Sequence, residues 1–166
     1  ETGDLSAMPY AKANTPQLLA ALMRVFINSM DAMPTGGTIK VSCRERMVSN
    51  IRRRLNPNAK KGRYVVLRIE DTGHGMARNV TERVFEPFFT TKDPSVAKGL
   101  GLTIVNNSVL SWGGWITVRS SPGAGTTVSF FIPRADVQRA KIRPKAAQRT
   151  ALVIDDNPDD LSAIRS

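Results

Sequence analysis

Cysteine and histidine are almost absent from this 166-residue chain, which has only Cys43 and His74. One cysteine cannot form an internal disulfide, and one cysteine with one histidine falls short of the ligand set of a Cys/His zinc site. Cys43 lies in an alternating apolar pattern, so we expect a buried and unreactive thiol. The scarcity of these residues therefore excludes a disulfide scaffold and a zinc domain.

Long apolar runs are also missing. No stretch approaches the roughly 20 apolar residues of a membrane-spanning helix, and the polar start of the chain lacks the pattern of a secretory signal peptide. Hydrophobic residues make up 41% of the chain and charged residues 23%, which is typical of a globular protein. We therefore expect a globular domain with no direct membrane contact.

Acidic residues are few beside basic ones, 14 against 24, and the net charge is +10. Many of the basic residues gather in two stretches, 52–63 and 134–149, which carry the composition of a loop and a linker. Neither stretch interleaves aromatic residues with its charges, as single-strand nucleic-acid binders do. We therefore predict solvated basic loops and no nucleic-acid partner. Steering of an anionic ligand or an acidic partner is the less favoured alternative.

Hydrophobic periodicity predicts alternating helices and strands as far as residue 133. Thr15 is expected to cap the first helix with Pro16 at its first position, and an apolar face continues to about Met33. A polar stripe follows the same helix and contains Gln17, Arg24, Asn28 and Asp31. The expected helices are 15–33, 77–84 and 100–112, and the expected strands are 38–43, 64–70, 115–120 and 126–133.

A glycine-rich run, Asp71-Thr-Gly-His-Gly-Met76, directly follows the second expected strand. The glycines at 73 and 75 permit positive φ and allow a flat ring to approach the backbone. The Asp71 carboxylate can accept a hydrogen bond from an exocyclic amine, and Met76 offers an apolar contact. Taken alone, the same run is also the pattern of a plain tight turn.

Two further features suggest an anionic ligand. Gly99-Leu-Gly-Leu102 opens a helix, where free N–H groups attract anions, although such a run is also common at helix entries without a ligand. Asn28 can offer a neutral oxygen to Mg²⁺, which takes few protein ligands beside phosphates and water. The alternative for Asn28 is a polar residue on a solvated face.

The order of these runs resembles the histidine-kinase ATP-binding domain. Residues 28–33, together with 36–39 and 71–76, resemble its N and G1 boxes, and Phe85–Lys92 is similar to the F box. Residues 99–102 resemble the end of the G2 box, and 122–126 the last glycine motif. Five boxes in family order make the resemblance specific.

The resemblance implies an α/β (α+β) two-layer sandwich of the Bergerat type, with a mixed, largely antiparallel sheet covered on one face by three helices. It implies ATP and Mg²⁺ as cofactors. Asp71 would bind the adenine amine, assisted by Gly75 and Thr126, and Asn28 would hold Mg²⁺ through the ATP phosphates. The full implied ATP-binding set is Asn28, Asp31, Asp71, Gly73, Gly75, Met76, Thr91, Lys92, Lys98, Gly99, Leu100, Gly101, Leu102 and Thr126.

Three departures from the family pattern limit the expected chemistry. Family kinases phosphorylate a histidine on a separate helical hairpin, whereas His74 lies inside the adenine loop, so we assign no catalytic residue and expect no autophosphorylation by this chain alone. Arg24 occupies a position that is acidic or an amide in relatives, and an arginine cannot act as a general base at neutral pH; it could instead pair with Asp31 or reach a phosphate.

The third departure lies in the lid. Ser95 and Ala97 replace lid glycines, while Lys98 adds a charge that suits a phosphate. The alternative function is a degenerate nucleotide-binding regulatory or docking module.

The predicted organisation has four parts. Residues 1–14 form a lead-in from a missing dimerisation hairpin, 15–134 the ATP-binding domain, 135–149 a basic linker and 150–166 the truncated start of a receiver domain. The last assignment depends on Leu152-Val-Ile-Asp155-Asp-Asn157, which resembles a receiver's first strand and acidic pair. The resemblance thus implies a hybrid sensor kinase of a two-component phosphorelay, a class that is often membrane-anchored elsewhere, with this part in the cytoplasm. The hairpin and the receiver domain of that parent are the implied partners of this domain.

Overall fold

The computed structural model describes residues 10–49, 59–93 and 97–135 of the chain. The chain divides into two compact units, Glu1–Asp136 and Val137–Ser166, and every described residue lies in the first. The predicted receiver start, nearly all of the predicted linker and residues 1–9 of the lead-in therefore lie outside the described residues, as does Ser95.

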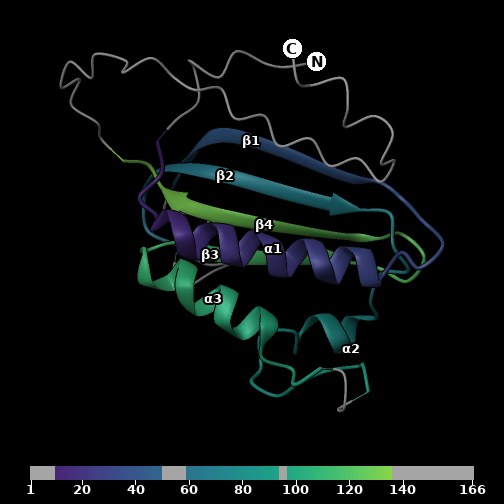
Figure 1. Cartoon of the computed structure of the whole chain (residues 1–166). Coiled ribbons are helices and arrows are strands. Elements are labelled where there is room, and N and C mark those ends of the chain that lie inside the picture. Colours follow the sequence, from purple (N-terminus) through teal and green to yellow (C-terminus); the bar gives the residue numbers. More distant parts are fainter. Residues whose placement is uncertain (1–9, 50–58, 94–96, 136–166) are drawn as a thin grey trace, which may run out of the picture. The chain divides into compact units, whose positions relative to one another are not determined.

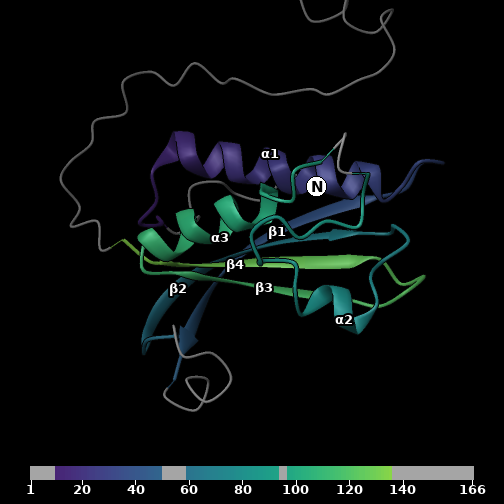
Figure 2. The same ribbon diagram turned by 90° about the horizontal axis from the view of Figure 1, so that it is seen from below.

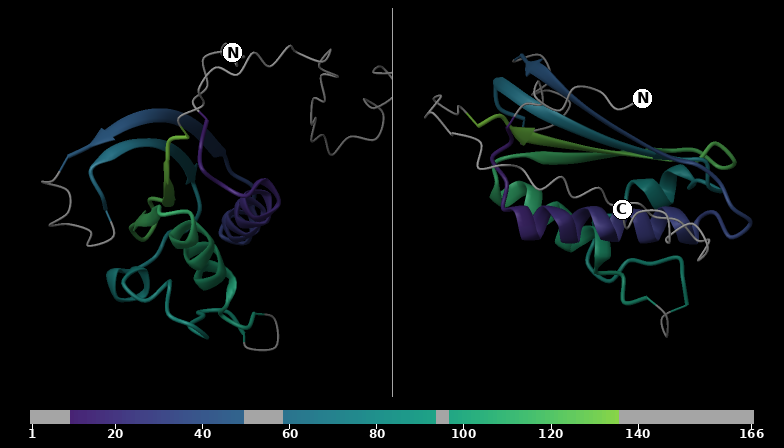
Figure 3. Two further views of the ribbon diagram at one scale, coloured as in Figure 1. Left: turned by 90° about the vertical axis from the view of Figure 1, so that its left-hand side faces the viewer. Right: turned by 45° about the horizontal axis from the view of Figure 1, so that its top comes forward.

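The first unit is a two-layer α+β sandwich, as the sequence predicted (Figures 1 and 2). Its sheet has the strand order β1-β2-β4-β3, and all described pairings are antiparallel. Helices α1, α2 and α3 lie on one face of this sheet, which is twisted and curves over them (Figure 3). In chain order the elements are α1 (Thr15–Asp31), β1 (Ile39–Val48), β2 (Gly62–Asp71), α2 (Arg78–Thr81), α3 (Gly101–Ser111), β3 (Trp115–Ser120) and β4 (Thr126–Pro133).

The main core lies between the central strands and the two longer helices. Strands β2 and β4 are neighbours at the centre of the sheet, and Leu67 is opposite Phe130 in their register. Residues alternate across a strand, so one side of each strand faces the helices. The buried members of this core are Ala21, Val25, Ile69, Val105, Val109, Ile116, Val128, Phe130 and Ile132.

A smaller cluster occupies the opposite face of the sheet. The rings of Trp115 and Phe131 stack with centroids 4.5 Å apart, and Tyr64 meets Trp115 edge-on. The Tyr64 hydroxyl donates to the carbonyl oxygen of Lys60 at 3.0 Å, and burial raises the pKa of this phenol. The cluster thus fastens the chain just before β2 to the outer face of the sheet.

The ends of α1 differ from the prediction. Asn14, not Thr15, caps the helix, because its side-chain oxygen accepts from the backbone N–H of Gln17 at 3.1 Å. Pro16 therefore sits at the second helical position. The helix ends at Asp31 instead of about Met33, since the residue before Pro34 is disfavoured in the helical region.

The first strand is longer and more exposed than predicted. It continues to Val48, which pairs with Gly62, and so takes up part of the expected basic connection. An edge strand tolerates charged residues such as Arg44 and Arg46 because only one of its sides is paired. The expected burial of Cys43 is also wrong: the buried core packs on the other three strands, and Cys43 on the edge strand is exposed. Partial desolvation still raises the pKa of its thiol, which favours the unreactive protonated form at neutral pH.

The remaining boundaries are close to expectation. Strands β3 and β4 have the predicted bounds, and β2 gains a residue or two at each end. Helix α2 is shorter than the predicted 77–84, and α3 begins and ends one residue inside the predicted range. The apolar face of α1 is wider than its buried contact, because Leu19 and Met30 are more than half exposed. Within the described residues no helix combines the length and apolarity needed to cross a bilayer.

Phe130 provides a test of the core, because it is fully buried at the centre of the sheet. We expect Phe130→Ala to lower the free energy of unfolding by about 3–5 kcal/mol, since it removes buried surface and leaves a cavity. The matched control, Leu19→Ala, removes a side chain that is 58% exposed, and should change stability by no more than about 0.5 kcal/mol. Urea denaturation followed by circular dichroism measures both. Similar losses for the two variants would contradict the assigned core.

Candidate functional site

The Asp71 side chain is the centre of the candidate site. It ends strand β2 and is only 8% exposed. Its Oδ1 atom accepts from the backbone N–H groups of Gly73 and Thr126, each at 3.0 Å, and its Oδ2 atom accepts from the Ser29 hydroxyl at 2.9 Å. Donors from helix α1, the glycine-rich loop and strand β4 therefore fix this carboxylate in one orientation.

The glycines around Asp71 bring backbone against backbone. Gly75 has φ of 67°, and a Cβ there would overlap the Ser121 carbonyl. Gly125 has φ of 75°, and a Cβ there would overlap the carbonyl of Asp71 itself. Both positions thus need glycine for conformation and for space.

Hydrogen bonds tie the glycine-rich loop to its neighbours. The His74 N–H donates to the carbonyl of Ala32 at 3.0 Å, and the His74 carbonyl accepts from the Gly123 N–H at 2.7 Å. The Met76 N–H donates to the Ser120 hydroxyl oxygen at 2.8 Å. The His74 imidazole also lies within the loop, with Nδ1 2.7 Å from the Gly75 carbonyl oxygen, in agreement with its interpretation as a loop residue.

Ser29 and Ser120 belong to the candidate site by their contacts, and the sequence interpretation missed both. The Ser120 hydroxyl also lies 2.9 Å from the Gly125 carbonyl and 2.9 Å from the Thr126 hydroxyl. It joins the loop to the hairpin between β3 and β4. Ser29 had a detectable signal, because it follows Ala21 and Val25 at steps of four along the buried side of α1. For Ser120 the sequence offers no comparable pattern.

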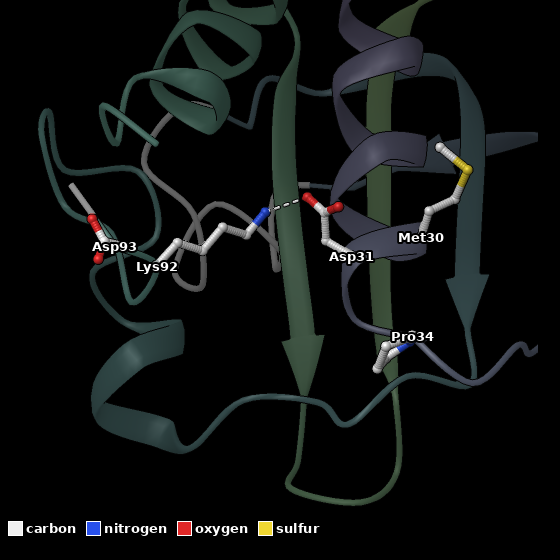
Figure 4. Close-up of a pocket in the computed structure, with 5 residues that line it drawn as sticks. All are labelled: Met30, Asp31, Pro34, Lys92 and Asp93. Atoms are coloured by element: carbon white, nitrogen blue, oxygen red, sulfur yellow. Dashed lines mark hydrogen bonds and ion pairs between the residues drawn. The ribbon is translucent and has the colours of Figure 1, made fainter. Parts of the chain in front are cut away.

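A separate hollow of about 460 Å³ lies near the end of α1 and is lined by Met30, Asp31, Pro34, Lys92 and Asp93 (Figure 4). The Lys92 ammonium pairs here with the Asp31 carboxylate. Both side chains are more than a third exposed, and an ion pair of this kind contributes at most about 1 kcal/mol. Lys92 is thus held close to α1 by a contact that a stronger anion can replace.

Asn28 lies on the same side of α1 as Asp31, three residues earlier. Its side chain is half-buried, and no hydrogen bond joins it to any residue that the structure describes. A neutral amide oxygen with no partner suits Mg²⁺. Groups of three or more acidic, cysteine or histidine side chains able to hold a metal are absent from residues 10–49, 59–93 and 97–135. A cation at Asn28 would therefore need further oxygens from a bound ligand.

Arg24 does not pair with Asp31, because Asp31 pairs with Lys92. Arg24 lies two helical turns before Asp31, about 10 Å along the axis. It is exposed, and no ion pair in the described part of the chain includes it. The predicted pairing of Arg24 with Asp31 is therefore not seen, and contact of Arg24 with a phosphate stays a prediction.

The segment before α3 is joined to the F-box-like run. Gly99 has φ of 66°, and a Cβ there would lie 2.7 Å from the Phe89 carbonyl oxygen. The Thr103 hydroxyl donates to the carbonyl of Phe85 at 3.1 Å. Phe88 itself takes a positive φ of 64°, a strained conformation for a non-glycine residue. The F-box-like run and the start of α3 therefore form one unit.

The start of α3 offers free backbone donors. Leu100 is the N-cap residue, no side chain caps the helix, and Gly101 has open space where a Cβ would stand. The first N–H groups of a helix without a cap suit an anion. Thr91 and Lys98 are exposed on either side of residues 94–96, and no described hydrogen bond joins them to Asp71. Leu102 packs against the main core instead.

Comparison with known proteins places this arrangement in a family. A family model described as "Histidine kinase-, DNA gyrase B-, and HSP90-like ATPase" matches residues 13–136, which include the whole site. The chain belongs to this family. It therefore carries an ATP-binding domain of the histidine-kinase type.

The similar proteins are sensor kinases. The chain is 37% identical to the sensor kinase CckA of Brucella abortus over 82% of its own length and 15% of that protein. It is 30% identical to the sensor histidine kinase ZraS of Escherichia coli K12, over 76% of the chain and 23% of the relative. Among solved structures, the mycobacterial sensor histidine kinase MprB matches with a TM-score of 0.54 and 27% identity, covering 74% of this chain and 73% of that one. The chain thus spans less than a quarter of these two curated relatives.

Alanine substitutions at two glycines of the same hairpin can distinguish the effect of a steric overlap from that of backbone strain. Gly123 and Gly125 share φ of 75°, but a Cβ has open space at Gly123 and overlaps the Asp71 carbonyl at Gly125. We expect Gly123→Ala to cost about 1–2 kcal/mol of stability from strain alone. Gly125→Ala should cost more and should also displace Asp71 and weaken ATP binding. Thermal denaturation with ATP titration checks both variants, and equal effects would contradict the close contact.

Proposed function

We propose that this chain is the ATP-binding catalytic domain of a hybrid sensor histidine kinase, which presents the γ-phosphate of ATP to a histidine on a separate hairpin in a two-component phosphorelay. The observation that carries this proposal is the Asp71 carboxylate, held by three donors beside the glycine-rich loop. A fixed carboxylate suits the exocyclic amine of adenine because it presents only acceptors.

The adenine ring would lie against the loop backbone at Gly73 and Gly75. Glycine has no side chain to cover the backbone there, and the close approach of Ser121 requires glycine at position 75. Thr126 assists through its N–H, which orients Asp71, and Met76 contributes an apolar side chain at the end of the loop. Together these contacts favour a planar ring that carries an amine.

The phosphates would lie toward the hollow beside α1. Lys92 can exchange the weakly bound Asp31 carboxylate for phosphate oxygens, which carry more charge. The free N–H groups at Gly101 and Leu102 offer further donors, with Thr91, Lys98 and the backbone of Gly99 and Leu100 nearby in sequence. Mg²⁺ would supply neutralisation of phosphate charge, with Asn28 as its protein ligand.

The chain itself offers no acceptor for the phosphoryl group in this proposal. His74 is engaged through its backbone in the loop, and Arg24 stands where a general base would be needed for hydrolysis. Phosphoryl transfer relies mainly on positioning and electrostatics, so the domain's contribution is to bind and orient ATP. The acceptor histidine would come from a dimerisation hairpin that precedes residue 15.

The proposed organisation follows from this role. Residues 15–134 form the ATP-binding domain, 1–14 lead in from the hairpin, 135–149 link onward, and 150–166 begin a receiver domain of the same parent. The domain would work on the cytoplasmic side of a parent kinase that is membrane-anchored elsewhere. Supporting this organisation, the similar proteins are named sensor kinases and are several times longer than the chain.

A second candidate function is a regulatory or docking module that binds nucleotide without transfer. Arg24 and Ala97 favour it, because each replaces a residue type that the family pattern uses for catalysis or lid movement. The fixed Asp71 and unpartnered Asn28 side chains are common to both functions. A measurement of ATP binding therefore tests both candidate functions together, and a measurement of phosphate transfer distinguishes one from the other.

Asp71→Asn tests nucleotide binding. An asparagine keeps one acceptor oxygen and replaces the other with an NH₂ donor. That NH₂ group would face either the N–H donors of Gly73 and Thr126 or the Ser29 hydroxyl and the adenine amine. In both orientations a donor would face a donor. We expect ATP affinity in the presence of Mg²⁺ to fall by about tenfold or more in calorimetric titration. The matched control is Glu70→Gln, which alters the adjacent carboxylate, paired with Arg68 at 2.7 Å, and should leave affinity unchanged. An unmutated chain that does not bind ATP would rule out both candidate functions.

Phosphate transfer distinguishes the kinase domain from the docking module. The full chain, γ-labelled ATP and the parent's histidine hairpin are combined, and label on the hairpin is followed with time. We expect transfer with the hairpin, none to the chain without it, and little with Asp71→Asn because ATP is bound too weakly. Tight ATP binding with no transfer would support the docking module instead.

A further inference from the structure

Ser29 is a hydroxyl on an otherwise apolar buried line of α1. Ala21, Val25 and Ser29 follow one another at steps of four, and Ser29 is only 3% exposed. Burial of an unbonded hydroxyl costs free energy, whereas alanine is already accommodated two turns earlier at residue 21. The hydroxyl therefore needs a partner that compensates for its burial.

That partner is not the helix itself. A serine inside a helix commonly donates to the carbonyl four residues earlier, as Ser108 does to Ile104 at 3.0 Å in α3. Ser29 instead donates to Oδ2 of Asp71, 42 residues further along the chain. A hydroxyl has a single hydrogen, so the only donor of Ser29's side chain is committed to this carboxylate.

The hydrogen bonds of Asp71 determine which of its oxygens can receive a ligand. Each carboxylate oxygen has about two acceptor positions. Those of Oδ1 are taken by the N–H groups of Gly73 and Thr126. Ser29 occupies one position of Oδ2, which leaves the second as the free acceptor. A ligand amine would have to be received by the oxygen that Ser29 holds.

We propose that Ser29 is a positioning residue that directs the free acceptor of Asp71 and thereby makes the site select 6-amino purines over purines that lack this amine. The inference rests on the proposed function, because it assumes that Asp71 receives adenine. A 6-oxo purine would place a carbonyl oxygen against an acceptor, which the site rejects. Without the Ser29 hydroxyl, Oδ2 is no longer held from α1 and its free acceptor loses its direction.

The test compares two nucleotides that differ in the amine. The full chain is titrated calorimetrically with Mg²⁺ and either ATP or purine riboside triphosphate, which carries hydrogen at position 6. We expect Ser29→Ala to weaken ATP binding about tenfold while binding of the analogue changes by less than about twofold. The control Ser108→Ala, which removes a helical serine bonded only within its own helix, should leave both affinities unchanged.

The outcomes are distinct. Unchanged ATP binding by Ser29→Ala, or equal losses for the two nucleotides, would overturn the inference, since the second result is that of a purely structural residue. Should the alanine variant fail to fold, Ser29→Cys keeps nearly the same shape with a weak donor and must show the same selective loss for ATP. Failure of the unmutated chain to bind ATP overturns the proposed function, and the inference with it.

Discussion

The hydrogen bonding of one carboxylate holds the site together. Asp71 is a buried acidic residue, and burial of a charge is tolerated only where donors surround it. Its three donors come from segments that are far apart in sequence, namely helix α1, the loop after β2 and strand β4. Bonding Asp71 therefore also fixes the end of α1 against the sheet and the hairpin against the glycine loop. The geometry of the ligand site and the packing of the domain depend on the same contacts.

This dependence explains the concentration of glycine near Asp71. For Ser29 and Thr126 to reach the same side chain, the loop and the hairpin must approach to backbone contact. Side chains at Gly75 or Gly125 would overlap neighbouring carbonyls, and both residues have positive φ. Ser120 then joins the two segments through the Met76 N–H and the Gly125 carbonyl. The spacing of the glycines is thus a consequence of how closely the chain packs around the carboxylate.

These contacts also show what the sequence can and cannot predict. Strands β3 and β4 were predicted with their observed bounds, because the proline-glycine turn at 122–125 marks both ends of the hairpin. The length of β1 was not predicted. Its second half is held by backbone pairing with β2, and its charged side chains do not reveal this pairing. Asp71 and its glycines were predicted from their motif, whereas Ser29 and Ser120 act through partners distant in sequence. The cap at Asn14 was missed since Thr15 is an equally good capping residue.

The two halves of the site differ in how firmly they are built. Asp71 is buried and bonded by backbone and hydroxyl donors, so the half of the site that we propose for adenine is held rigidly by the protein itself. In the half that we propose for the phosphates, Lys92 and Asp31 form an exposed ion pair that contributes little to stability, and the Asn28 side chain has no described partner. A rigid base site needs little reorganisation, so base recognition can anchor the ligand while the groups around the phosphates change partners. Such a division suits a domain that must bind one nucleotide specifically and yet release its terminal phosphate to an acceptor on another segment.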